Sequence, residues 1–211
     1  MKIYEFLQPV FDDFKKEIPT WKNIIFTKKG IWIFIPGIIS MLFVYLADAN
    51  GWKACIAKSL NENIALYLMS MVTLIMLIRV IIYHYHLDII LFALSVSFLC
   101  REIHFTGTHK GIYVALTLIL IWGFFWRKHL FKDFASSKIL KLFFAGMVWT
   151  YTLAILIQRR ALRGIIPYER KLHIPLEEVG ENVSHLFFIA VALLCFTLYK
   201  KQAMNKNKDE D

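Results

Sequence analysis

The sequence predicts an all-α protein, a polytopic transmembrane helical bundle of about six spans, and three observations lead to that prediction. Hydrophobic residues make up 58% of the 211-residue chain, more than the half or so that is usual in a soluble domain. They are grouped in blocks of about 17 to 22 residues, the length at which a helix crosses roughly 30 Å of hydrocarbon. The backbone must hydrogen-bond to itself within a bilayer, so several such blocks indicate a bundle of helices.

The chain divides into three parts. Residues 1–30 repeat apolar side chains at helical spacing opposite a charged face, which predicts an N-terminal amphipathic helix at the membrane surface. A helix packed on the cytoplasmic ends of the bundle fits the same pattern. Residues 31–199 form the transmembrane domain, and residues 200–211 predict a disordered charged tail. The six spans are expected at about 31–47, 63–82, 88–104, 110–126, 138–158 and 181–199.

Two charged residues flank the turn between the second and third spans. Arg79 lies in the last turn of the second span, from where its long side chain is expected to reach the membrane surface. Asp88 is expected to cap the start of the third span. Because only residues 83–86 connect the two spans, we expect a tight antiparallel hairpin.

The distribution of basic residues predicts the orientation. Six spans place both termini on one side, and that side carries 16 of the 25 Lys and Arg residues, against 9 on the other. Positive charge is enriched on the cytoplasmic side of membrane proteins, so both termini are expected in the cytoplasm. In a membrane protein the distribution of Lys and Arg matters more than the net charge, here +9, because the distribution determines the orientation. The expected partners are therefore membrane lipids and no nucleic acid. The sequence does not predict partner subunits.

With this orientation, two polar segments, residues 100–110 and 176–185, lie on the outer side. Glu177, Glu181 and His185 follow one another at intervals of four residues and share one helix face. Charged groups at membrane depth usually face the bundle interior and pair there. The first interpretation is therefore structural: Arg101 pairs with a glutamate of the last span, and His185 is a hydrogen-bonded core residue.

A second interpretation of the same segments is a metal-dependent hydrolase or transferase that acts on a lipid headgroup. The candidate ligands of a divalent metal such as zinc are Glu102, His104, Glu181 and His185. The metal would activate a water molecule, with Glu177 or Glu178 as the proton acceptor. Lipid-headgroup binding without catalysis stands beside the structural interpretation, and in either case the candidate headgroup-binding residues are Arg101, Lys110, Arg159, Arg160 and Arg163. A third interpretation is a path for protons or ions.

Residues 101–105 with Lys110, and residues 176–181, resemble a group of bacterial polytopic inner-membrane proteins. These carry an Arg-Glu-x-(Asp/His)-Phe stretch at the end of one span and a Glu-Glu-x-x-Glu stretch at the start of the last. The resemblance implies a bacterial inner-membrane location and no particular activity. The outer layer of acids and histidines is also similar to that of membrane-embedded zinc hydrolases related to alkaline ceramidase. Those proteins have seven spans and an H-x-x-x-H pair, where this chain has Glu181-x-x-x-His185.

Overall fold

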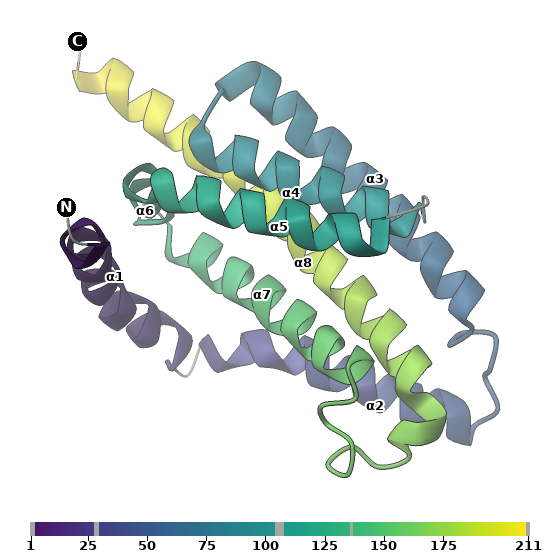
Figure 1. Ribbon diagram of the computed structural model, residues 1–211. Helices are drawn as coiled ribbons and strands as arrows, with labels where there is room; N and C mark the ends of the chain where they lie inside the picture. Colours follow the sequence, from purple (N-terminus) through teal and green to yellow (C-terminus); the bar gives the residue numbers. More distant parts are fainter. Residues whose placement is uncertain (1–2, 28–29, 104–107, 136, 210–211) are drawn as a thin grey trace.

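The computed structural model describes residues 3–27, 30–103, 108–135 and 137–209, and its named elements are all helices (Figure 1). The all-α prediction is therefore confirmed. The elements are α1 (Ile3–Ile25), η1 (Gly30–Phe34), α2 (Ile35–Ala49), α3 (Lys58–Tyr83), α4 (His86–Glu102), α5 (Thr108–Phe125), α6 (Arg127–Ala135), α7 (Lys138–Gln158) and α8 (Glu169–Asp209).

Four stretches of these helices are long and apolar enough to cross a membrane. They are Gly30–Ala49, Lys58–Tyr83, Lys138–Gln158 and Glu169–Phe196. Helix α5 is apolar but shorter, over Gly111–Phe125, and α4 has only 17 residues, with charges at both ends. By length and hydropathy the chain is a candidate multi-span membrane protein with four such helices, where the sequence predicts six spans.

Helix α8 runs through the middle of the molecule, with α3 and α7 packed along it (Figure 1). Helix α4 packs on α3, α5 packs on α4, and α2 contacts α8. Both termini, the α3–α4 turn and α6 lie toward one end of the bundle, which we call the termini end. The connections at residues 50–57 and 159–168 lie toward the other end, the loop end.

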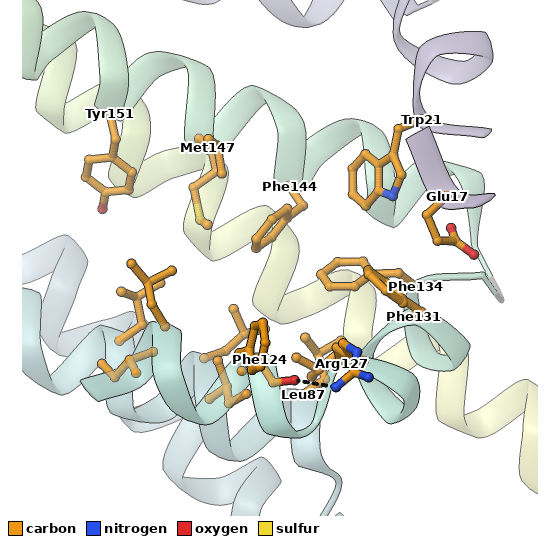
Figure 2. A pocket seen from close by; sticks show the side chains of 18 of the residues that line it. Glu17, Trp21, Leu87, Phe124, Arg127, Phe131, Phe134, Phe144, Met147 and Tyr151 are labelled. Atoms are coloured by element: carbon orange, nitrogen blue, oxygen red, sulfur yellow. Dashed lines mark hydrogen bonds between the residues drawn. The ribbon is translucent and has the colours of Figure 1, made fainter. Parts of the chain in front are cut away.

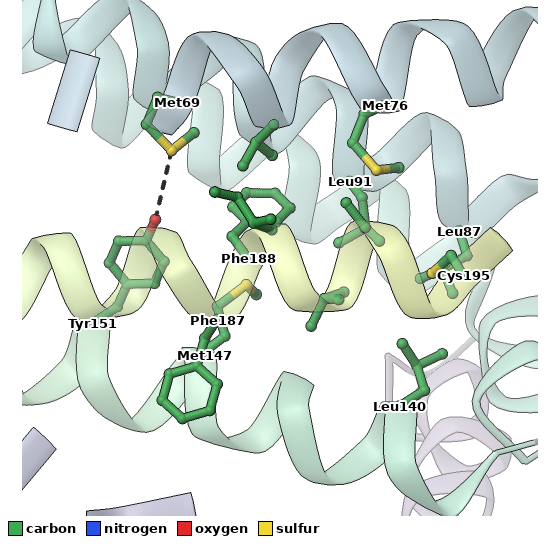
Figure 3. Packing of buried hydrophobic residues seen from close by; sticks show 14 of the residues in the cluster. Met69, Met76, Leu87, Leu91, Leu140, Met147, Tyr151, Phe187, Phe188 and Cys195 are labelled. Carbon is green, nitrogen blue, oxygen red and sulfur yellow. Dashed lines mark hydrogen bonds between the residues drawn. The ribbon is translucent and has the colours of Figure 1, made fainter. Parts of the chain in front are cut away.

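The main core lies where α3, α4, α7 and α8 meet, and methionine and phenylalanine fill much of it (Figure 3). Met69 and Met76 of α3, Met147 of α7 and Phe188 of α8 are all buried. Lipid chains are as apolar as these side chains, so helices in a bilayer associate through close packing more than through the hydrophobic effect. Flexible methionines suit such a core because they fill irregular gaps.

The hairpin between α3 and α4 is present, but its two charged residues are placed differently from the prediction. Arg79 is fully buried, and its Nε and Nη2 donate to Asp88 Oδ1 at 3.0 and 2.7 Å. The N-cap of α4 is Tyr85, and His84 ends α3 with a left-handed backbone (φ 55°). This short turn brings the last turn of α3 against the first turn of α4. Arg79 therefore pairs with Asp88 and does not reach the surface.

Helix α8 is longer at both ends than predicted. It begins at Glu169 and continues through Pro175, so Glu181 lies about three turns inside the helix instead of at its start. The added turns are anchored by Leu172 and Leu176, which are buried in a small core together with Val44 of α2. At the other end, residues 200–209 are helical where the sequence predicts a disordered tail.

Candidate functional site

Five polar side chains from three helices meet in the half of the bundle nearer the loop end. Arg101 and Glu102 lie in the last turn of α4, Tyr151 lies on α7, and Glu181 and His185 lie one turn apart on α8. We call these five residues the polar cluster. The side chains of Glu102, Glu181 and His185 are more than nine-tenths buried. Buried charges and imidazoles need partners, so the contacts within the cluster determine what it can do.

Arg101 and Glu181 form the contact that joins α4 to α8. The Arg101 Nη2 donates to Glu181 Oε1 at 2.5 Å, with the arginine side chain 24% exposed and the glutamate 6% exposed. The predicted pair between Arg101 and a glutamate of the last span is therefore present. A charge-assisted hydrogen bond of this length between two helices fixes their relative position.

We expect Arg101→Gln and Glu181→Gln each to lower the free energy of unfolding by about 1 kcal/mol, a typical value for an interhelical polar contact within a membrane. Because both changes remove the same contact, the loss in the double variant should be smaller than the sum of the single losses. Unfolding of the purified protein in detergent measures this. Arg101→Gln combined with Glu178→Gln serves as the control and should be additive. Additive losses in the Arg101/Glu181 pair would contradict direct pairing.

His185 lies between a hydroxyl and a carboxylate. Its Nδ1 is 2.7 Å from the hydroxyl oxygen of Tyr151, and its Nε2 is 4.0 Å from Glu102 Oε1. The second distance is too long for a hydrogen bond, and within the described residues Nε2 has no hydrogen-bond partner. A tyrosine that donates to Nδ1 leaves the imidazole hydrogen on Nε2, facing Glu102. His185 is thus the hydrogen-bonded core residue that the first interpretation predicts.

Tyr151 was not predicted as part of the site. A tyrosine inside an apolar block resembles its neighbours in hydropathy, and here it is the partner of His185. The feature that could have identified Tyr151 is its hydroxyl, because a buried tyrosine usually hydrogen-bonds to another polar group. His185, a polar residue inside the last apolar block, is the matching partner on the facing helix.

Three of the four predicted metal ligands, Glu102, Glu181 and His185, lie in the polar cluster, but their described contacts are with other groups. Glu181 faces Arg101, and His185 faces Tyr151 and Glu102. Among the residues that the structure describes, no group of three or more His, Cys, Asp or Glu side chains could hold a metal ion. His104, the fourth predicted ligand, lies outside the described residues. The described part of the chain therefore does not support the metal interpretation.

The two predicted proton acceptors make different contacts. Glu177 Oε1 accepts a hydrogen bond of 2.5 Å from Gln158 Nε2, near the end of α7. Glu178 has no such contact in the described residues, and it interacts electrostatically with Glu181 and Glu177 of its own helix and with Glu62 and Lys58 of α3. Glu177 also interacts electrostatically with Glu181 and Lys58, so both predicted acceptors lie beside the polar cluster.

The predicted headgroup-binding arginines of the loop contact neighbouring polar groups. Arg159 hydrogen-bonds to the hydroxyl of Tyr113 on α5, and Arg160 Nε lies 3.8 Å from Glu169 Oε1. Of the other three predicted bases, Arg101 pairs with Glu181, Arg163 is exposed, and the side chain of Lys110 lies outside the described residues. The described contacts of Arg159 and Arg160 thus lie at the loop end and do not involve the polar cluster.

A large apolar groove lies between α5 and α7, with α4 at its back and α1 and α6 at its termini end (Figure 2). Its volume is about 1080 Å³. In Figure 2, Tyr151, Met147 and Phe144 of α7 point into it, and Trp21 of α1 lies at the opposite end from Tyr151. Other apolar side chains that line it include Ile18, Leu91, Leu94, Phe98, Leu116, Ile119, Leu120, Phe131, Phe134, Val148 and Ile155.

The groove and the polar cluster share one residue. The ring of Tyr151 lines the groove and is stacked on Phe98 of α4 at 4.7 Å. Its hydroxyl belongs to the polar cluster. The chain therefore contains a buried polar contact that fixes α4, α7 and α8, and beside it an apolar space that those helices leave open. Comparisons with protein-family models, curated proteins and solved structures find no match.

Proposed function

We propose that this chain is a six-span protein of the bacterial inner membrane, with both termini in the cytoplasm, which binds a membrane lipid in the groove between α5 and α7. In addition to the four long helices, α4 and α5 would cross the bilayer. A helix of 17 residues, like α4, is at the short end of the spanning range. Small local thinning of the bilayer accommodates such a span at modest cost. The concentration of Lys and Arg on the side of the termini supports the orientation.

The groove is the observation that carries this proposal. Its walls are apolar, and it lies between helices whose other faces expose Leu118 and Val114 of α5 and Ile139 of α7. Water is a poor occupant of such a space, because it needs several polar partners. A hydrocarbon chain from the surrounding bilayer meets apolar side chains on every wall and requires no polar partner.

The polar cluster then has a structural role in the same function. Arg101 and Glu181 join α4 to α8, and Tyr151 joins α7 to α8 through His185. Helices α4 and α7 form the back and one wall of the groove. Helices α5 and α7 do not pack on each other, so direct contact between them does not set the width of the groove. The contacts that fix α4 and α7 to α8 keep the groove open at a defined width.

We expect Leu116→Trp to displace the lipid. Leu116 is a half-buried leucine that lines the groove, and an indole ring there fills part of the space that a lipid chain would occupy. Leu118→Trp is the matched control, because Leu118 lies on the same helix, is 60% exposed and does not line the groove. Native mass spectrometry of the protein released from detergent counts the phospholipids that remain bound.

The wild type and Leu118→Trp should retain at least one phospholipid, and Leu116→Trp should retain fewer. A wild type that carries no lipid would contradict the proposal. A groove occupied by a helix of a second copy would give a dimer in the same spectrum, and Leu116→Trp would then yield monomers without any change in bound lipid. Unfolding measurements on both variants show whether they are folded.

A further inference from the structure

The termini end of the groove is basic, whereas its walls are apolar. Lys22 of α1 and Arg127 of α6 line the groove at that end. Glu17 also lines the groove, but it lies 3.7 Å from Lys141, and Asp13 accepts a hydrogen bond from Arg127 at 3.0 Å. Asp12 of α1 is exposed. The exposed basic residues of α1 and α6 are Lys15, Lys16, Lys22, Lys128 and Lys132. Lys22 lines the groove and the other four lie elsewhere on the same two helices; we call these five lysines the basic rim.

The groove is long enough to hold most of an acyl chain. Its lining residues on α7 extend from Phe144 to Ile155, and those on α4 from Leu87 to Phe98. Each stretch covers about three helical turns, roughly 16 Å. The Phe98–Tyr151 stack lies at the far end, away from the basic rim. A lipid whose headgroup lies at the rim would therefore have its chains along the groove and their ends near Tyr151.

We infer that the occupant is an anionic phospholipid from the leaflet on the side of the termini, with its headgroup at the basic rim. This inference rests on the proposed function and adds the class of lipid and the direction in which it lies. Negative lipid surfaces attract a lysine or arginine by about 1 kcal/mol for each residue near the surface, a factor of about five in binding. A zwitterionic headgroup has no net charge and gains little from the rim.

The inference is tested with the full chain and two phospholipids that have the same acyl chains, phosphatidylglycerol and phosphatidylcholine, supplied in equal amounts in mixed micelles. Native mass spectrometry then counts each retained lipid. We expect phosphatidylglycerol to be preferred at least fivefold, and Lys22→Gln to reduce that preference about fivefold. Lys53→Gln, in the exposed loop after α2, is the matched control and should leave the preference unchanged. Added salt should weaken the preference, because it screens exposed charges.

Each outcome has a separate meaning. Equal retention of the two lipids, unaffected by Lys22→Gln, would overturn the inference and leave the proposed function standing. Retention of neither lipid would overturn the proposed function itself. If Leu116→Trp retains as much phosphatidylglycerol as the wild type, the anionic lipid binds the outer surface of the protein, and the groove assignment is wrong.

Discussion

Replacing Asp88 with alanine is expected to lower the free energy of unfolding by about 3–5 kcal/mol, the cost of removing one partner from a buried ion pair. The side chains of Arg79 and Asp88 are both 0% exposed. Two nitrogens of the arginine donate to the same carboxylate oxygen, and its guanidinium also lies over the ring of Phe196, 4.6 Å from the centroid. Alanine at position 88 removes the carboxylate and leaves the cation buried at the α3–α4 hairpin.

Asp48→Ala is the matched control for this experiment. Asp48 also pairs with a basic residue, Lys171, at 2.7 Å, but the lysine side chain is 66% exposed. Exposed pairs contribute about 1 kcal/mol or less, so Asp48→Ala should have a small effect on unfolding in detergent. The double variant Arg79→Met/Asp88→Leu should recover most of the loss, because an apolar pair of similar volume can replace a buried ion pair. A loss in Asp88→Ala no larger than in Asp48→Ala would contradict this account.

The α3–α4 hairpin shows which structural features the sequence alone predicts and which it does not. The short turn at residues 83–86 correctly predicts that two helices run antiparallel and adjacent. The same turn implies that Arg79, near the end of one helix, faces Asp88, near the start of the next. Each residue taken alone predicts an arginine that reaches the surface and an aspartate that caps a helix. The two helices taken together predict the Arg79–Asp88 pair.

The polar cluster was partly predictable. The four-residue spacing places Glu181 and His185 on one face, and the cost of unpaired charge in a membrane predicts that Arg101 meets a glutamate. The start of α8 was not predictable from hydropathy, because Glu169–Pro175 is polar and contains a proline. Of its apolar residues, Ile174 is exposed, and Leu172 is buried, like the following Leu176, in a core that α2, α7 and two loop residues complete. These contacts are tertiary and leave no local pattern.

The groove could not be predicted from the sequence. It exists because α5 packs on α4 and not on α7, and the apolar side chains that face this gap look the same in sequence as those that face lipid. Leu116 lines the groove and Leu118 does not, yet the two residues belong to one continuous apolar block. Only the arrangement of the helices distinguishes a wall of the groove from the outer surface.

The second large effect is expected at Gly146, where α7 and α8 come close together. A Cβ atom at this position would lie 2.7 Å from Phe187 Cε1 and 2.9 Å from Phe187 Cζ, closer than two carbon atoms can pack. The Phe187 ring is itself buried and packs against Phe143, with 5.9 Å between ring centroids. Gly146→Ala is therefore expected to lower the free energy of unfolding by about 1–3 kcal/mol, as overpacking of a filled core does. The direction of this change in stability is informative, because replacing glycine by alanine inside a helix otherwise stabilises a protein by roughly 0.5–1 kcal/mol.

Gly180→Ala provides the matched control on the facing helix. Its added Cβ atom would lie 3.7 Å from Ala154 Cβ, an ordinary van der Waals contact, so this variant should be neutral or slightly stabilising. Phe187→Leu, which removes the ring that the new methyl group meets, should be less destabilising in the Gly146→Ala background than in the wild type. That non-additivity identifies the ring as the cause, because residues in contact are coupled and distant ones are not. A Gly146→Ala protein as stable as Gly180→Ala in the same detergent would show that α7 and α8 are farther apart than described.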